Sequence, residues 1–254
     1  MGKNSSLRRE QLWLLKDKYA GKPCSAFFSD IERLPRGEPL PYIIGWVPFL
    51  DASIKISRGT LIPRVETEYW TEKAILEIKE KYNKKIRVLD MFSGSGCIGI
   101  SVLKALPNAH VTLSDKYEYA LSQIAENLRH NEIRKTQFEV VQSDFLDNIY
   151  GSFDVVLANP PYLSKKRVKK IDTSVLLWEP LEALFAEKDG LNYLFMLIEN
   201  FKKILKKNGT LYIEHDPWQV SSLKKKVGSI PNISYEFIRD QFGKERVLKI
   251  SPHV

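Results

Sequence analysis

The sequence predicts an α/β fold, a doubly wound and mainly parallel sheet that ends in an antiparallel edge hairpin. From Ile86 onward, short apolar segments alternate with helical segments. Within the short segments the apolar residues are nearly continuous, which is typical of strands buried on both faces. This alternation indicates a parallel sheet with helices on both sides. The last two apolar segments are separated only by the polar turn QFGKE, so we expect them to pair antiparallel.

Each element can be placed by its residues. The expected strands span residues 86–91, 110–115, 138–144, 153–159 and 210–216, and the edge hairpin spans 233–240 and 246–253. The expected helices span residues 97–106, 117–130, 190–207 and 217–227. Upstream, Gly21 and Pro23 divide a helical stretch at 7–34 into two short helices, and residues 42–58 predict a β-hairpin. We therefore expect a short N-terminal helical segment (1–36), a linker hairpin (37–70) and one α/β domain (71–254).

Length and composition narrow the class of protein. The 254 residues suffice for one large α/β domain with a small appendage. The two cysteines, Cys24 and Cys97, form no C-x-x-C pair and the four histidines do not cluster, so we expect no metal site and a reducing, cytoplasmic environment. No apolar run approaches the roughly 20 residues that span a bilayer. The net charge of +8 permits an anionic partner such as nucleic acid. We expect the protein to be a monomer.

A glycine-rich loop follows the first strand of the α/β domain. In the segment VLDMFSGSGCIGISVL, the residues Gly94, Gly96 and Gly99 satisfy the pattern G-x-G-x-x-G. Missing side chains let the backbone approach a ligand, and the following helix begins with unpaired N–H groups. Asp115 ends the next strand, 19 residues after Gly96, where a carboxylate can accept hydrogen bonds from both hydroxyls of a ribose. Together these features predict an adenosine cofactor without separating a nicotinamide dinucleotide from S-adenosylmethionine.

Asp144 and Phe145 close the third strand and should lie beside the same crevice. The carboxylate can accept a hydrogen bond from an adenine amino group, and the phenyl ring can pack against the base. Taken alone, the pair is explained more simply as a helix N-cap followed by a core residue.

The turn Asn159-Pro160-Pro161-Tyr162 follows a buried strand at its carboxyl end, where ligands bind in such sheets. Two successive prolines fix φ and remove two N–H donors, so the carbonyls of the turn are rigid acceptors. The side-chain oxygen of Asn159 is a second acceptor, and two acceptors suit a planar NH₂ group with its two donors. Tyr162 offers a face on which a planar amide or base can stack.

This arrangement accounts for methyl transfer without a side-chain base. Holding both N–H bonds aims the nitrogen lone pair at the methyl group of a sulfonium, and catalysis is then mostly positioning for an in-line displacement. A proline-rich turn that merely ends a strand is the alternative explanation. The glycine loop, Asp115 and Asp144 precede the turn on successive strands, and this context favours an S-adenosyl-L-methionine-dependent methyltransferase with the class I, Rossmann-like layout.

Several further segments carry a resemblance to a known family. They are GEPLPYIIGWVPF (37–49), LIPRVETE (61–68), WEPLEAL (178–184), DGLNYL (189–194), NGTLYIEHDPWQ (208–219) and GKERVLKI (243–250). Over residues 35–254 the chain resembles the release factor glutamine methyltransferases, which methylate the glutamine side-chain amide in the Gly-Gly-Gln motif of class I peptide chain release factors. The resemblance implies that activity, S-adenosyl-L-methionine as cofactor and a release factor as protein partner.

The resemblance also implies roles for individual residues. The methionine part of the cofactor would be bound by the loop residues Phe92, Ser93, Gly94, Ser95 and Gly96. Asp115 would bind the ribose, Asp144 and Phe145 would bind the adenine, and Asn159 would contact the cofactor from the turn. The glutamine amide would be bound by Asn159, Pro160, Pro161 and Tyr162, of which Asn159, Pro160 and Tyr162 would be catalytic. The mouth of the site would carry Arg64, Glu66 and Glu68.

The chain departs from the family pattern at three points. Phe92 stands where the family usually has glycine, Val65 replaces a proline of the linker motif, and the helical region before the linker is about half the usual length. The main alternative is an amino-methyltransferase that acts on an exocyclic amine of RNA or DNA, with the base flipped onto Tyr162 and KKRVKK (165–170) binding phosphates. The linker motif and Trp-Glu-Pro favour the release factor. A non-catalytic module would not need Asn159, and a nicotinamide oxidoreductase leaves the Asn-Pro-Pro-Tyr turn unexplained.

Overall fold

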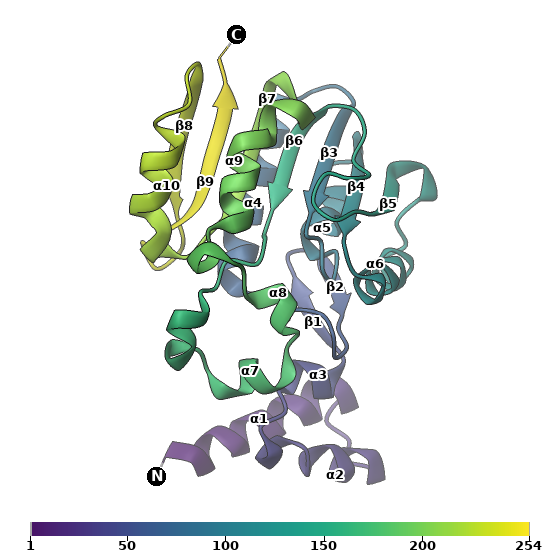
Figure 1. Ribbon diagram of the computed structural model, residues 1–254. Coiled ribbons are helices and arrows are strands. Elements are labelled where there is room, and N and C mark those ends of the chain that lie inside the picture. Colours follow the sequence, from purple (N-terminus) through teal and green to yellow (C-terminus); the bar gives the residue numbers. More distant parts are fainter. Residues whose placement is uncertain (1, 254) are drawn as a thin grey trace.

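A seven-stranded sheet forms the centre of the protein, for which a computed structural model describes residues 2–253 (Figure 1). Its strand order is β5-β4-β3-β6-β7-β9-β8. The strands are β3 (Ile86–Met91), β4 (Ala109–Asp115), β5 (Phe138–Gln142), β6 (Phe153–Ala158), β7 (Leu205–Glu214), β8 (Ile233–Arg239) and β9 (Glu245–Pro252). Strands β3 to β7 pair in parallel, whereas β9 is antiparallel to both β7 and β8. The predicted doubly wound sheet with an antiparallel C-terminal hairpin is confirmed.

Helices α4 (Val65–Lys81), α5 (Cys97–Ala105), α6 (Glu118–His130), α9 (Asn192–Ile204) and α10 (Val220–Val227) cover the two faces of this sheet. The other helices are α1 (Gly2–Tyr19), α2 (Ser25–Ile31), α3 (Leu40–Ile44), α7 (Thr173–Trp178) and α8 (Leu181–Leu184). Short 3-10 turns are η1 (Leu34–Arg36), η2 (Lys135–Gln137), η3 (Lys165–Lys170), η4 (Lys188–Gly190) and η5 (Pro217–Gln219). Apolar residues of α4, α5 and α6 form one core with the sheet, and those of α9 and α10 form a second core on the opposite face.

The parallel strands place the sequence motifs at one level. Met91 of β3 pairs with Ser114 of β4 on one side and with Ala158 of β6 on the other. The glycine loop, Asp115 and Asn159 therefore begin at the same edge, at the carboxyl ends of three adjacent strands. The chain winds outward in opposite directions from β3 and β6, which is the switch point where ligands bind in such sheets.

The predicted hairpin is formed by β1 (Trp46–Phe49) and β2 (Ala52–Lys55), and it lies beside α6 (Figure 1). Asn127 of α6 binds the edge of β2 as a neighbouring strand would: its Oδ1 accepts from the Lys55 N–H at 2.8 Å, and its Nδ2 donates to the Lys55 carbonyl at 2.9 Å. The side-chain amide thus satisfies backbone groups that an edge strand leaves open. The hairpin is thereby fixed next to the carboxyl edge of the main sheet.

The N-terminal helices pack around a small core of their own. Leu14, Phe27, Leu34 and Ile43 are buried together, and the Lys18 ammonium donates to the Ile43 carbonyl at 2.6 Å. In Figure 1 this unit lies below the hairpin, away from the main sheet. Helix α4 begins inside the predicted linker, and the division of the chain at residues 36 and 70 stays a prediction.

One predicted helix is too long. The expected helix at 190–207 ends at Ile204, and the chain enters β7 at Leu205, which pairs with Phe153. Lysines are good helix formers, so the segment after Ile204 reads as helix from local preference. The tertiary contact with β6 overrides it, and Lys206 forms an ion pair with Asp154 at 2.8 Å. The short helices α7 and α8 carry no clear apolar period and were not predicted.

Candidate active site

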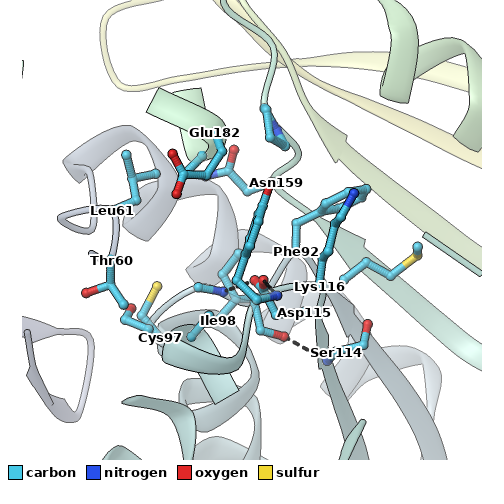
Figure 2. Close-up of a pocket in the computed structure, with 18 of the residues that line it drawn as sticks. Thr60, Leu61, Phe92, Cys97, Ile98, Ser114, Asp115, Lys116, Asn159 and Glu182 are labelled. Atoms are coloured by element: carbon cyan, nitrogen blue, oxygen red, sulfur yellow. Dashed lines mark hydrogen bonds between the residues drawn. The ribbon is translucent and has the colours of Figure 1, made fainter. Parts of the chain in front are cut away.

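A first cavity opens at the carboxyl edge of β3, β4 and β5. Figure 2 shows Asp115 at its floor, with Thr60 and Leu61 of the linker on one side and Phe92 and Lys116 on the other. The residues expected to bind the cofactor that line this cavity are Phe92, Ser93, Gly94, Ser95, Asp115, Asp144, Phe145 and Asn159. The segment before α4 therefore closes over a site whose base is made by the sheet.

Asp115 is tied to the backbone of the glycine loop. Its Oδ2 accepts from the Gly94 N–H at 2.9 Å, and its Oδ1 accepts from the Tyr117 N–H at 3.1 Å. Burial raises the pKa of Asp115, while these backbone donors act in the opposite direction. Each carboxylate oxygen has a further lone pair, so the fixed carboxylate can still accept from the two hydroxyls of a ribose. The donor set fits an adenosine cofactor.

The three glycines of the loop do different things. Gly94 lines the cavity, whereas Gly96 does not and instead precedes α5 in a left-handed conformation, with φ of 80°. At Gly99 an added Cβ would lie 2.8 Å from Cδ2 of Leu113 and 2.9 Å from Oδ2 of Asp90. That Asp90 oxygen accepts from the Gly99 N–H, and burial raises the pKa of Asp90 to about 7. Gly96 and Gly99 thus shape the loop and pack α5 on the sheet.

Phe92 adopts a backbone conformation that glycine favours. Its φ is 58°, a left-handed value that costs a phenylalanine about 1–2 kcal/mol. Its ring meets the ring of Tyr193 edge to face, with centroids 5.1 Å apart, and both residues line the cavity. The loop therefore keeps the geometry of its usual glycine, and the extra side chain becomes part of the cavity wall.

Asp144 and Phe145 lie beside this wall. The Asp144 carboxylate is about half exposed, with a side-chain exposure of 49%, and forms an ion pair with Lys116 at 2.7 Å. Phe145 also lines the cavity and has a left-handed φ of 54°. Asp144 is thus more open to solvent than Asp115, and one of its oxygens already has a cationic partner.

A second cavity lies on the other side of the Asn-Pro-Pro-Tyr turn. Pro160 and Tyr162 line it, whereas Pro161 lines the first cavity. Asn159 lines both, as do Leu61 and Arg64 of the linker. Asn159 therefore stands where the two cavities meet, and the other side chains of the turn line one cavity or the other.

A buried carboxylate that the sequence analysis left without a role underlies this turn. Glu214, at the end of β7, accepts from Tyr162 Oη at 2.9 Å, from Thr67 Oγ1 at 2.7 Å and from Trp70 Nε1 at 2.6 Å. Burial raises the pKa of Glu214, and the three donors and the nearby Arg246 guanidinium oppose that shift. Glu214 belongs to the segment NGTLYIEHDPWQ, which carries part of the family resemblance, but the sequence assigned it no contact or role.

The linker is fastened across the site by an ion pair. Arg64 Nη2 lies 2.7 Å from Oε1 of Glu179, and the second oxygen of this buried carboxylate accepts from the Ile62 N–H at 3.1 Å. The linker motif and Trp-Glu-Pro, 115 residues apart at this contact, thus meet over the first cavity. Glu66 lines the second cavity, whereas Glu68 lines neither and accepts from the Leu50 N–H at 2.6 Å.

The basic run at η3 reaches the acceptor side. Arg167 and Lys170 line the second cavity, and the Arg167 guanidinium lies 4.8 Å from the ring centre of Trp218.

Within residues 2–253, no three His, Cys, Asp or Glu side chains gather in a group that could hold a metal ion. None of the helices in this described range is long and apolar enough to cross a bilayer.

Removal of the Asp115 carboxylate should weaken cofactor binding strongly. We expect Asp115→Ala to raise the dissociation constant for S-adenosylhomocysteine by roughly 10- to 100-fold, because hydrogen bonds to a charged group contribute about 1.5–3 kcal/mol. Isothermal titration calorimetry measures this directly. Asp144→Ala is the matched comparison and should have a smaller effect, since that carboxylate is half exposed and paired with Lys116. A larger effect for Asp144→Ala would contradict the assignment of Asp115 to the ribose.

Comparison with known proteins agrees with this geometry. A family model described as "Methyltransferase small domain" matches residues 73–186. Among solved structures, the ribosomal protein L11 methylase of Lactobacillus delbrueckii subsp. bulgaricus has a TM-score of 0.55 at 18% identity and covers 77% of this chain and 82% of its own. A methyltransferase complexed with SAH, SMU.776, has a TM-score of 0.54 at 13% identity and covers 78% and 53%. At such identities the likeness shows the fold alone, which is that of the class I methyltransferases.

Sequence relatives are closer. The release factor glutamine methyltransferase of Lactococcus lactis subsp. lactis (strain IL1403) is 34% identical over 240 residues, which are 93% of this chain and 86% of the relative. That of Thermodesulfovibrio yellowstonii is 33% identical over 240 residues, which are 94% and 85%. At 33–34% identity over more than nine tenths of its length, the chain belongs to the release factor glutamine methyltransferase family.

Proposed function

We propose that the protein transfers a methyl group from S-adenosylmethionine to the side-chain amide nitrogen of the glutamine in the Gly-Gly-Gln motif of class I release factors. The observation that carries this proposal is the place of Asn159 between the cavity that holds Asp115 and the glycine loop and a second cavity. The names of the relatives supply the acceptor. The chain's own residues supply a reason why an amide suits the second cavity.

The first cavity would hold the cofactor, which supplies an electrophilic methyl group on a sulfonium. The glycine loop would lie along the methionine part, with Gly94 as the residue where backbone comes closest. Asp115 would accept from the ribose hydroxyls, and Asp144 with Phe145 would flank the adenine. Asn159 would then lie at the end of the cavity from which the methyl group leaves.

On the acceptor side, the glutamine amide would be held by two acceptors. One N–H would donate to Oδ1 of Asn159 and the other to the backbone carbonyl of Pro160. With both hydrogens held, the nitrogen faces the first cavity with its lone pair. The nitrogen would then form its new bond to the methyl carbon in line with the breaking bond to sulfur, whose electron pair would stay on sulfur. The extra proton on the nitrogen would pass to solvent after the new bond has formed.

Tyr162 would form the wall on which the planar amide rests. Its hydroxyl donates to Glu214, so the ring is held in place. Burial and the neighbouring carboxylate raise the pKa of Tyr162 well above its ordinary value. The phenol is therefore neutral at physiological pH, and it acts in this proposal as a surface and not as a base.

A labelling experiment tests the proposed acceptor. Incubation with methyl-labelled S-adenosylmethionine and an isolated class I release factor should place label on the peptide that contains the Gly-Gly-Gln glutamine. A factor in which this glutamine is replaced by alanine is the control and should stay unlabelled. Label on added RNA or DNA, with the factor untouched, would show that the alternative acceptor, an exocyclic amine of a base, is the correct one.

We also propose that the protein acts as a monomer in the cytoplasm. Two isolated cysteines suit a reducing compartment.

A further inference from the structure

We propose that Thr67 and Glu214 are positioning residues that fix the side-chain amide of Asn159 with its oxygen toward the acceptor. The inference rests on the proposed function for the chemistry, but its geometry concerns only residues of this chain. Thr67 lies in the first turn of α4 and Glu214 at the end of β7. Thr67 lines the first cavity and Glu214 the second. In the mechanism above neither touches the reacting atoms, and they would act through Asn159 and Tyr162.

The direction of every hydrogen in this group follows from Glu214. It is 1% exposed and faces three donors, and the Arg246 guanidinium lines the same cavity. With Trp70 and Thr67 at one oxygen and Tyr162 at the other, each neighbouring side chain donates to it. An ionised carboxylate only accepts, so this arrangement satisfies it fully. The hydrogen of the Thr67 hydroxyl therefore points at Glu214.

The direction of the Thr67 hydroxyl hydrogen determines the orientation of the Asn159 side-chain amide. A threonine hydroxyl has one hydrogen, and since Thr67 gives it to Glu214, it can only accept from any other neighbour. Nδ2 of Asn159 lies 3.3 Å from Thr67 Oγ1, so the NH₂ half of the amide faces Thr67. The oxygen half is left for a bound ligand. A flipped amide would present hydrogens to the hydrogens of the acceptor NH₂ and could not hold it.

The same carboxylate also holds Tyr162. One oxygen of Glu214 binds Thr67, which orients the Asn159 amide that would receive one N–H of the acceptor. The other oxygen binds Tyr162, whose ring would carry the plane of the acceptor amide. The contact of Thr67 with Glu214 joins residues 147 positions apart in the chain. Through this contact the linker motif and the end of β7 would together orient the acceptor side of the Asn-Pro-Pro-Tyr turn.

Kinetic variants of Thr67 test the proposal. Thr67→Val keeps the shape and removes the hydroxyl, and we expect kcat for the release factor to fall by roughly 10- to 100-fold because the acceptor is misplaced. The dissociation constant for S-adenosylhomocysteine should change by less than about threefold. Thr67→Ser restores the hydroxyl and should return kcat to within about threefold of the wild-type value. A Val variant with wild-type kcat would overturn the proposal.

Thr71→Val is the matched control. Thr71 lies one turn further along α4, is fully buried, and donates its hydroxyl hydrogen to the backbone carbonyl of Thr67 at 2.7 Å. The variant loses a buried hydroxyl of the same kind without touching Asn159, so it should lower the melting temperature as Thr67→Val does and leave kcat unchanged. An equal loss of kcat in both variants would show that general loosening of α4, and not the orientation of Asn159, is responsible.

A spectroscopic readout separates this inference from the proposed function. The side-chain NH₂ signals of Asn159, identified by their loss in Asn159→Ala, should shift in Thr67→Val, return in Thr67→Ser and stay in Thr71→Val, all without any substrate. Unshifted signals in Thr67→Val would overturn the inference even if the release factor is methylated. The expected shifts together with an unlabelled release factor would instead refute the proposed acceptor and leave the positioning role intact.

Discussion

Asn159→Ala is expected to abolish methyl transfer while cofactor binding stays close to the wild-type level. The side-chain oxygen is one of the two acceptors that hold the amide, and loss of a single such hydrogen-bonding group in an active site costs about 100- to 1000-fold in kcat. The turn itself should persist, since two prolines fix its backbone and Gln219 Nε2 donates to the Tyr162 carbonyl at 3.0 Å. Single-turnover transfer to the release factor and calorimetric titration with S-adenosylhomocysteine measure the two quantities.

The two measurements together locate Asn159 on one side of the reaction. If transfer and cofactor binding are lost to the same extent, Asn159 belongs to the cofactor site and the proposed role on the acceptor side is wrong. Asn148→Ala serves as the control. That side chain is exposed, donates to the Gln142 carbonyl at 2.8 Å and lines neither cavity, so its removal should alter neither quantity.

Gly190→Ala should destabilise the protein by more than about 3 kcal/mol and remove activity, because Gly190 lies directly against the catalytic turn. An added Cβ would lie 2.1 Å from the carbonyl oxygen of Tyr162 and 2.9 Å from Nε2 of Gln219. These distances are far inside van der Waals contact, so the turn or η4 must move. A movement of the turn would displace the Tyr162 carbonyl from Gln219 Nε2 and so weaken the support of the proposed acceptor wall. Urea unfolding and the transfer assay report the two effects.

Gly243→Ala is the control that separates the steric collision at Gly190 from the backbone strain of a left-handed alanine. Its φ of 75° is close to the 82° of Gly190, but no atom lies within 4 Å of the added Cβ. Both variants pay the cost of a left-handed alanine, about 1–2 kcal/mol, and only one collides. Equal losses of stability would mean that the close approach of Gly190 to Tyr162 is absent in solution.

Much of the fold follows from local patterns in the sequence. The continuous apolar runs that become β3, β4 and β6 are buried on both faces, and their period alone indicates strands in a covered sheet. The register of those strands then places the glycine loop, Asp115 and Asn159 at one edge. The start of β7 could not be found in this way, because local preference favours helix where pairing with β6 enforces a strand.

The support of the site is not visible in the sequence. Thr67 reads as an ordinary residue in the first turn of a helix, and Glu214 as a polar end to a strand. Only the packing of α4 against the end of β7 reveals that they bind each other and orient Asn159. Likewise the pairing of Arg64 with Glu179 joins two motifs that could be recognised separately but not connected. Contacts between residues more than a hundred positions apart in the chain produce no hydrophobic periodicity and no motif spacing from which they could be predicted.

The placement of Asn159 between two cavities has a consequence for how such enzymes diversify. The first cavity is formed by the ends of β3, β4 and β5 together with the linker, whereas the second cavity adds η3, the end of β7 and the start of β9 to the linker. Under the proposed function, substitutions in η3, at the end of β7 or at the start of β9 can therefore change which nitrogen is presented without altering residues that line the first cavity. A change of acceptor would then require substitutions around the second cavity and none at Asp115 or in the glycine loop.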